Sequence, residues 1–221
     1  MRKPILHRTS NCHASKGRYH SSMFSSDSLS SSYNYERKDC KKYRDHPDCE
    51  CIPGQGELVK NGGFENPHRS FTNWVINSGV DVIDPGMGNF PHQGHTAARL
   101  GFIEPQALLY QIVPGICPGG FYQLVFFMGT AKNLVNAAVI VRLEFLDRHK
   151  QQLGGPALDI LIPQNSLFES YTAFINNTAW PSPPRTRFIR LVFETDTGAD
   201  ADNYVTLDDV SLAALEGTSH I

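Results

Sequence analysis

Two short signatures carry carboxylates near the two ends of the apolar part of the chain. Glu65 ends the stretch Asn61-Gly62-Gly63-Phe64-Glu65, and Asp208 lies in Leu207-Asp208-Asp209-Val210-Ser211-Leu212. Asn and Gly accept the positive φ angles of a tight turn, so the first signature predicts a turn with Glu65 beside it. Carboxylates at such positions can accept backbone hydrogen bonds. What else they do depends on whether folding brings them together.

Sequence motifs for catalysis are missing. The Gly-x-Ser-x-Gly elbow, the His-Glu-x-x-His zinc motif, the phosphate-binding loop and the Gly-rich dinucleotide turn do not occur. Asp and Glu are numerous, but no feature selects two of them as the carboxylate pair of a glycoside hydrolase. Cys117 stands between Ile116 and Pro118 without a motif that nominates a His partner. The sequence therefore predicts a protein that is not an enzyme.

Short apolar runs that alternate with a period of two fill residues 57–214, and Gly, Pro and Asp separate them. The longest are Phe121–Gly129 and Ala137–Asp147, and a period of two fits both better than 3.6. We expect eight to ten strands and no helix, hence an all-β fold, an antiparallel jelly-roll β-sandwich. The other expected strands are Glu57–Lys60, Phe71–Ile76, Thr96–Gly101, Ala107–Val113, Leu158–Ile162, Glu169–Ile175, Arg187–Glu194 and Tyr204–Leu212.

Residues 1–56 differ in composition from the rest. They hold ten Lys and Arg against six Asp and Glu, a net charge of +4, whereas residues 57–221 carry −6. Such a Ser-rich segment buries too little apolar surface to offset its ordering entropy. We predict a disordered or extended arm over 1–56, a sandwich over 57–215 and a short tail over 216–221. The charge of the arm is modest and diluted by acids, so no nucleic-acid partner is expected.

Five cysteines are present, four in the arm and Cys117 in the predicted sandwich. The spacing Cys49-Glu50-Cys51 is too tight for a zinc ribbon. Cysteines on a flexible arm suit intermolecular disulfides, and an odd count leaves at least one over. Cys40, Cys49 and Cys51 are therefore candidates for cross-links between chains, with thiols that have no role as the alternative.

Seven motifs follow one another along the chain: Asn61–Glu65, Trp74, His92–Gly101, Leu109–Val113, Tyr122–Phe126, Phe145–Asp147 and Leu207–Leu212. Together they resemble the motifs of galactose-binding-like β-sandwiches. The sequence looks like the carbohydrate-binding modules of that superfamily, and like related domains that precede repetitive regions in surface proteins of Gram-positive spore formers. The resemblance covers about residues 57–214 and none of the arm, and it implies fold more than function.

The resemblance implies a structural calcium ion. In such domains the Glu of the Gly-Phe-Glu signature and the first Asp of the Asp-Asp-Val signature hold the ion, and here these are Glu65 and Asp208. Ca²⁺ takes about six to eight hard oxygens from carboxylates and turn carbonyls, and Asn61 or the turn at Gly94 could add some. The alternative is that the two carboxylates only accept backbone hydrogen bonds.

The resemblance also implies glycan binding. Sugars stack their C–H faces on aromatic rings while their hydroxyls form hydrogen bonds. Trp74 could instead lie in the core, and Gln111 could satisfy strand backbone. Arg142 and Glu144 share one strand face and could pair across the sheet. The ligand-binding candidates are Trp74, Gln111, Arg142, Glu144 and Trp180, with Tyr110 and Phe127 as further exposed-looking rings.

We therefore expect a non-catalytic, surface-displayed module whose partner is a glycan or a surface protein. The alternative is a structural subunit of a spore-surface or fibre-like assembly, which self-associates by cross-links through the arm cysteines. No apolar run of about 18 residues occurs, so no membrane partner is expected. Residues 1–8 have the basic start of a signal peptide without its apolar stretch. An extracellular or spore-surface location reached by another route is the expectation.

Overall fold

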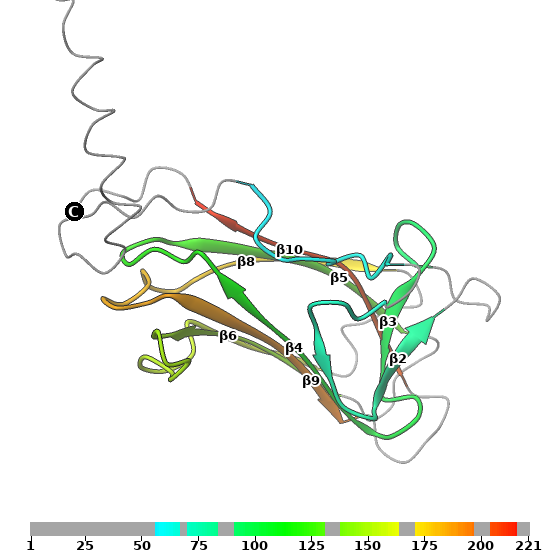
Figure 1. Ribbon diagram of the computed structural model, residues 1–221. Coiled ribbons are helices and arrows are strands. Elements are labelled where there is room, and N and C mark those ends of the chain that lie inside the picture. Colours follow the sequence, from blue (N-terminus) through cyan, green and yellow to red (C-terminus); the bar gives the residue numbers. More distant parts are fainter. Residues whose placement is uncertain are drawn as a thin grey trace, which may run out of the picture. The chain divides into compact units, whose positions relative to one another are not determined.

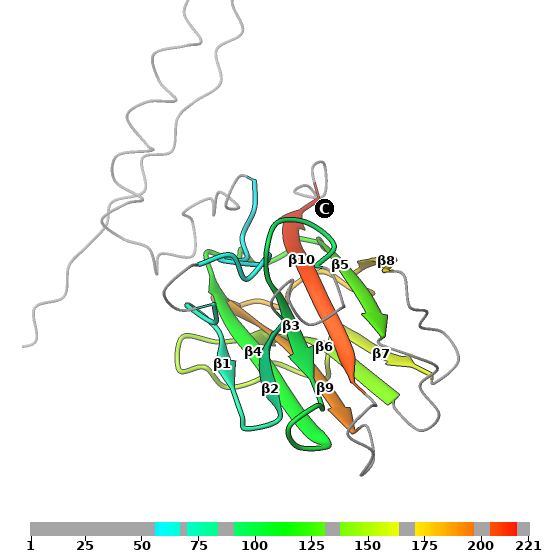
Figure 2. The same ribbon diagram turned by 90° about the vertical axis from the view of Figure 1, so that its right-hand side faces the viewer.

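The computed structural model describes residues 56–66, 70–83, 91–130, 138–163, 171–196 and 204–215. These residues form ten strands in two five-stranded sheets that face each other (Figures 1 and 2). None of them lies in a helix, so none forms a helix long and apolar enough to cross a membrane. The predicted all-β sandwich is confirmed. The predicted arm, except Gly56, and the predicted tail lie outside these ranges.

The strands of the two sheets are antiparallel throughout. Consecutive strands such as β5 and β6, or β9 and β10, belong to different sheets, as in a jelly roll. The first sheet has the order β1 (Val75–Ile76), β4 (Gln106–Pro114), β9 (Phe188–Asp196), β6 (Ala138–Leu146) and β7 (Leu158–Ile162). The second has the order β2 (Val80–Ile83), β3 (Ala97–Leu100), β10 (Val205–Ala214), β5 (Tyr122–Thr130) and β8 (Thr172–Asn177).

Alternate side chains of both sheets fill the core between them. Phe126 of β5 is fully buried, stacks on Phe174 of β8 at 5.1 Å and meets Phe193 of β9 at 5.3 Å. Each large apolar side chain buried in this way contributes about 1.5–3 kcal/mol. Rings from opposite sheets therefore interlock and hold the two layers together.

The segment that carries the first signature differs from its prediction. Glu57–Lys60 is irregular instead of a strand, although Leu58 N donates to Leu212 O at 2.9 Å and Val210 N donates to Gly62 O at 3.0 Å. The segment thus runs antiparallel beside β10. The second expected strand, Phe71–Ile76, is shorter, with turns before β1, and β2 forms where no strand was expected. Neither short element has enough alternating residues to reveal itself by period.

Gly62 is required by a close approach and not by a positive φ angle. The positive angles of this turn fall on Asn61 (55°) and Phe64 (57°). A Cβ on Gly62 would lie 1.9 Å from Val210 O, far inside any real contact. The signature needs glycine here because the backbone of β10 passes directly against it.

Candidate functional site

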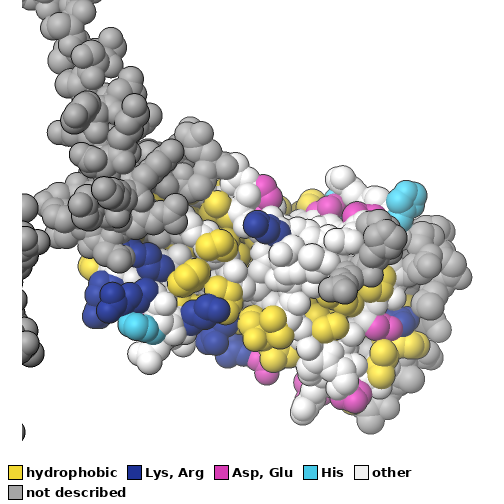
Figure 3. Space-filling model, in the orientation of Figure 1, with side chains coloured by type: hydrophobic (Ala, Val, Ile, Leu, Met, Phe, Trp, Pro, Cys, Tyr) yellow, Lys and Arg dark blue, Asp and Glu magenta, His cyan; other side chains and the backbone are white. Residues whose placement is uncertain are grey.

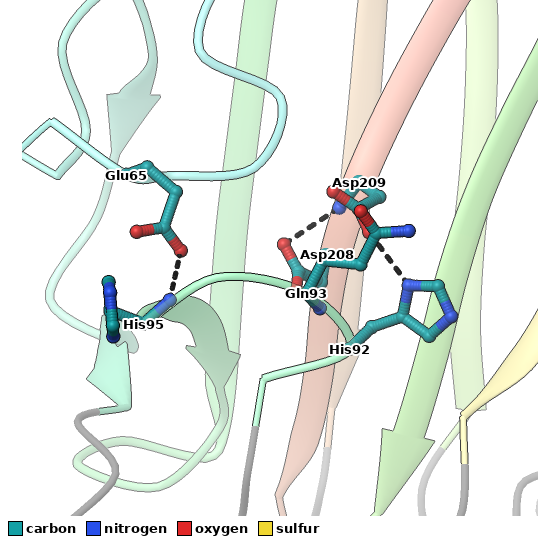
Figure 4. Close-up of polar contacts among 6 residues, drawn as sticks. All are labelled: Glu65, His92, Gln93, His95, Asp208 and Asp209. Carbon is teal, nitrogen blue, oxygen red and sulfur yellow. Dashed lines mark hydrogen bonds and ion pairs between the residues drawn. The ribbon is translucent and has the colours of Figure 1, made fainter.

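Glu65 and Asp208 both accept hydrogen bonds from one short loop, residues 92–96 (Figure 4). Gln93 N donates to Asp208 Oδ2 at 3.2 Å. His95 N and Thr96 N each donate to Glu65 Oε1 at 2.7 Å. Folding thus brings the two signature carboxylates to one place. We call Glu65, Asp208, Asp209 and loop 92–96 the carboxylate clasp.

Two glycines make room for these carboxylates. Gly94 has a φ of 70°, and a Cβ there would lie 2.3 Å from Glu65 Oε1. A Cβ on Gly63 would lie 3.4 Å from Asp209 Oδ1, 3.7 Å from Glu65 Cγ and 3.9 Å from Asp208 Oδ1. Three acidic side chains therefore gather around the backbone of Gly63.

Asp208 is the buried centre of the clasp. Its side chain is 0% exposed, and this burial raises its pKa to about 7, although hydrogen bonds from Gln93 N and Asp209 N oppose the rise. The register of β10 shifts after Asp208, and Asp209 takes a φ of 47°. The bulge directs Asp209 to His92, whose Nδ1 lies 2.7 Å from Asp209 Oδ2. The His92 ring stacks on Phe127 at 3.7 Å, so the loop is fastened to the sheet.

The clasp has the donor chemistry that calcium prefers, hard carboxylate oxygens, and a cation would relieve the cost of burying Asp208 in its charged form. The amide nitrogen of Asn61, the third predicted calcium ligand, is engaged with the following turn. Its Nδ2 donates to Ser70 O at 2.6 Å and to Thr72 O at 3.3 Å. Within the described ranges no three His, Cys, Asp or Glu side chains form a metal-binding group. A calcium ion here would therefore need further oxygens besides those of Glu65 and Asp208.

The outer face of the first sheet presents a second candidate site. Along β4, Leu109 and Gln111 point inward, so Tyr110 between them points outward. In the register, Tyr110 lies opposite Val192 of β9, which lies opposite Arg142 of β6. We call this surface the β4–β9–β6 face, and its side chains are Leu108, Tyr110, Ile112, Arg190, Val192, Glu194, Ile140, Arg142 and Glu144.

Two ion pairs lie on this face. Arg142 pairs with Glu194, and Arg190 Nε lies 2.5 Å from Glu144 Oε2. The Arg142, Glu194 and Arg190 side chains are 32%, 45% and 38% exposed. Arg142 and Glu144 of β6 thus each pair with a residue of the neighbouring strand β9, as expected if they are not ligand-binding groups. An exposed pair such as Arg142–Glu194 contributes about 0–1 kcal/mol, so the fold depends little on it. Glu144, at 8%, is the one buried member of the two pairs.

Other sites on the described surface mix apolar and charged groups. Figure 3 shows hydrophobic side chains interspersed with charged ones over one side of the molecule. Among the large hydrophobic residues that the structure describes, the most exposed are Ile175 of β8 at 65% and Leu161 of β7 at 63%. Trp180, in the loop after β8, is 42% exposed, and the adjacent Ala179 N donates to Ala157 O at 3.1 Å. Its ring is therefore accessible to a ligand, as predicted for an exposed aromatic residue.

Trp74 and Gln111 are buried, so the alternatives given for them hold: Trp74 lies in the core, and Gln111 satisfies backbone groups of a neighbouring segment. Trp74 is 7% exposed, packs 5.5 Å from the Phe64 ring, and donates from Nε1 to Asn61 O at 2.9 Å. Gln111 is 3% exposed. Its Oε1 accepts from Lys60 N and its Nε2 donates to Lys60 O, both at 2.9 Å. Both side chains hold the irregular first segment against the sandwich.

Arg190 and Glu194 are face residues that the sequence analysis did not select. Both lie between buried residues of β9, so a strict period of two could have placed them outward. Their partners on β6 depend on the register between strands that are far apart in sequence, which no local pattern contains. The cysteines Cys40, Cys49 and Cys51 lie outside the described residues.

Solved structures with a similar fold include two sugar-binding domains. The TmCBM61 structure in complex with β-1,4-galactotriose matches with a TM-score of 0.51 and 17% identity, over 71% of this chain and 97% of that one. The CBM22-1 xylan-binding domain from Paenibacillus barcinonensis Xyn10C matches with 0.50 and 12%, over 75% and 99%. The chain therefore has the fold of carbohydrate-binding modules. Identities this low establish the fold alone.

A viral protein shares the same sandwich within a longer chain. The enzymatically active domain of Bacteriophage CBA120 tailspike protein 4 matches with a TM-score of 0.52 and 18% identity. The match covers 72% of this chain and 21% of that structure, so this chain spans about a fifth of it. No family model and no curated protein matches this sequence.

Proposed function

We propose that the sandwich is a non-catalytic glycan-binding module and that the β4–β9–β6 face is its binding site. The observation that carries the proposal is the outward-facing Tyr110, in register with Val192 and Arg142 and close to two charged pairs. A sugar can stack its C–H face on the phenol ring while guanidinium and carboxylate groups bind its hydroxyls. The fold shared with carbohydrate-binding modules supports the proposal.

The charges of this face favour an uncharged glycan. Each Arg there is matched by a Glu, so the pairs present donors and acceptors without net charge. A strongly acidic glycan would have to compete with Glu144 or Glu194 for the guanidinium groups. A single tyrosine ring can stack one sugar unit, so the other units of a longer glycan would be bound by the polar groups of the face.

A glycan array followed by titration calorimetry on the full chain tests the site. Tyr110→Ala should weaken binding about tenfold, because ring stacking contributes about 0.5–1.5 kcal/mol beyond buried area. Tyr110→Phe should retain most of the affinity, and Ile175→Ala on the other sheet is the matched control. Trp180→Ala tests the loop after β8 as an alternative binding site, and it should leave the affinity unchanged if the glycan binds to the β4–β9–β6 face. Unchanged binding by Tyr110→Ala, or no glycan bound by the wild type, contradicts the proposal.

Calcium at the carboxylate clasp is a second proposal. Glu65 and Asp208 would hold the ion, which would supply positive charge beside a buried carboxylate and so stabilise the fold. Chelator-treated protein should gain melting temperature on addition of Ca²⁺, and Glu65→Gln should reduce that gain. Mg²⁺ serves as the control cation. A melting temperature that Ca²⁺ leaves unchanged argues for hydrogen bonds alone.

Display of the module, outside the cell or on a spore surface, remains a prediction for its location. The structural-subunit alternative depends on Cys40, Cys49 and Cys51, on which the described residues have no bearing. Electrophoresis of native material without reductant distinguishes the two roles. A ladder of disulfide-linked multimers would favour the assembly subunit, and a single monomer band would favour the binding module.

A further inference from the structure

Cys117 lies in the loop between β4 and β5, is 3% exposed, and is disulfide-bonded. The other four cysteines, Cys12, Cys40, Cys49 and Cys51, all precede residue 56. Within one chain its partner must therefore come from these four. We propose that the partner is Cys51, and that the disulfide fastens the start of the sandwich to the β4–β5 loop. This proposal is independent of glycan binding.

The direction of the first segment points toward Cys117. Leu58 bonds to Leu212 and Gly62 bonds to Val210, so moving back from Gly62 to Leu58 means moving forward along β10. At the end of that path, Leu215 N donates to Phe121 O at 2.9 Å. Phe121 comes directly after the loop that contains Cys117. A chain that continues backward from Leu58 in the same direction therefore approaches this loop.

The reach of the chain is sufficient. Leu58 is paired with Leu212, and Leu212 with Leu124, three residues from Phe121. At about 3.4 Å per residue this is on the order of 10 Å along the sheet. The seven residues back to Cys51 span up to about 25 Å when extended. Cys51 is also the cysteine nearest in sequence to Leu58, ahead of Cys49, Cys40 and Cys12.

The Cys117 backbone is held on two sides. Cys117 N donates to Tyr122 Oη at 2.9 Å, and Ser182 Oγ donates to Cys117 O. Gly119 N donates to Ser182 O at 2.8 Å, which ties the rest of the loop to the segment after β8. Burial raises the pKa of Tyr122 still further above neutral, and its hydroxyl donates to Cys117 O at 3.3 Å. A disulfide requires narrow geometry, and a fixed cysteine presents its sulfur in one position to an approaching partner.

Formation of this bond needs an oxidant, and a low-molecular-weight disulfide such as oxidised glutathione supplies it. The Cys51 thiolate attacks one glutathione sulfur and releases one glutathione thiol. The Cys117 thiolate then attacks the Cys51 sulfur and releases the second. Two cysteine thiols are oxidised and one glutathione disulfide is reduced. Cys51 is then unavailable for cross-links between chains, and the bond would persist in an oxidising environment.

Peptide mapping of the full chain identifies the partner. Free thiols are alkylated in denaturant without reductant, and the protein is then cleaved. Trypsin leaves Cys49 and Cys51 on one peptide, since no Lys or Arg separates them, whereas a Glu-specific protease cuts after Glu50 and separates them. The expected product joins the Cys51 and Cys117 peptides. A free Cys117, or its linkage to Cys49, Cys40 or Cys12, overturns the proposal.

Two further measurements distinguish bonds within one chain from bonds between chains. In protein refolded from a mixture of ¹⁴N and ¹⁵N chains, the linked peptides should be fully light or fully heavy, and a mixed species refutes the proposal. Cys51→Ser should lower the melting temperature by roughly 5–15 °C. Added to a variant that already carries Cys117→Ala, the same substitution should cause no further loss. Cys40→Ser is the matched control and should melt like the wild type. Equal melting of Cys51→Ser and wild type also refutes it.

Discussion

The outer faces of the two sheets treat polar side chains in opposite ways. On the second sheet, Asp208 is fully buried beneath loop 92–96, and Arg99 is 5% exposed, paired with Asp81 and covered by the Phe102 ring at 3.6 Å. On the β4–β9–β6 face, three of the four paired charges remain at least 32% exposed. On the second sheet the charged groups hold loops in place, whereas on the β4–β9–β6 face they remain accessible to solvent.

The difference separates structural from binding roles. A buried acceptor that loses its donors, or a donor that loses its acceptor, costs about 1–3 kcal/mol per group. Disrupting an exposed ion pair costs little free energy, so each charged group can leave its partner and bind a ligand instead. The clasp is therefore where substitutions should unfold the protein, and the β4–β9–β6 face is where they should alter binding.

The largest effect is expected for Gly62→Ala. The added Cβ would meet the Val210 carbonyl of β10, a backbone atom that cannot move aside, and should cost about 3 kcal/mol or more. Gly155→Ala is the control, since a Cβ there has open space and the position has no positive φ. Urea denaturation measures both free energies of unfolding. Similar values for the two variants would show that the first segment does not fit tightly against β10.

Asp208→Ala should cost about 2–3 kcal/mol, because Gln93 N and Asp209 N lose their acceptor. Asp159→Ala, an exposed carboxylate on β7 of the other sheet, should change stability by less than about 0.5 kcal/mol. Chemical denaturation of the pair compares a buried with an exposed acid. The contrast between the faces fails if both variants unfold at the same denaturant concentration.

The pH dependence of stability should reveal the buried carboxylate. The folded pKa of Asp208 is raised by burial to about 7, above the unfolded value of 3.8, so the folded state binds the extra proton. In chelator, the contribution of Asp208 is therefore greatest below pH 4 and is lost as the pH rises to about 7, by about 1–3 kcal/mol. Asp208→Asn should flatten this part of the profile. A wild-type profile that matches the Asn variant would show no buried titration.

The smallest effect on stability is expected on the β4–β9–β6 face. Arg142→Ala should change the free energy of unfolding by less than about 1 kcal/mol, because its partner Glu194 remains solvated. The same variant should bind a glycan found on the array several-fold more weakly, measured by titration calorimetry. Arg148→Ala, in the turn after β6, is the control for loss of one Arg. If Arg142→Ala destabilised the fold as much as Asp208→Ala, Arg142 would have a structural role and not a binding role.

Local patterns predicted the architecture well where strands are long. Alternation in β5 and β6 places Phe126 and Val141 in the core, and this period alone distinguishes a sandwich from a helical fold. The two carboxylate signatures could also be recognised, because each is a run of neighbouring residues, but the bulge that places Asp208 inside β10 is not a local feature. The two-residue β1 and the four-residue β2 offer too few alternations to be detected in the same way.

Tertiary structure alone decided what the polar residues do. Gln111 and Trp74 have the chemistry of ligand-binding groups, yet the irregular first segment packs against both and uses their hydrogen bonds for its own backbone. Arg190 meets Glu144 only because β6 and β9 pair in one register. Alternation with a period of two indicates only that neighbouring side chains point to opposite faces of the sheet. Which face is inside, and what covers it, follows from contacts between segments far apart in the chain.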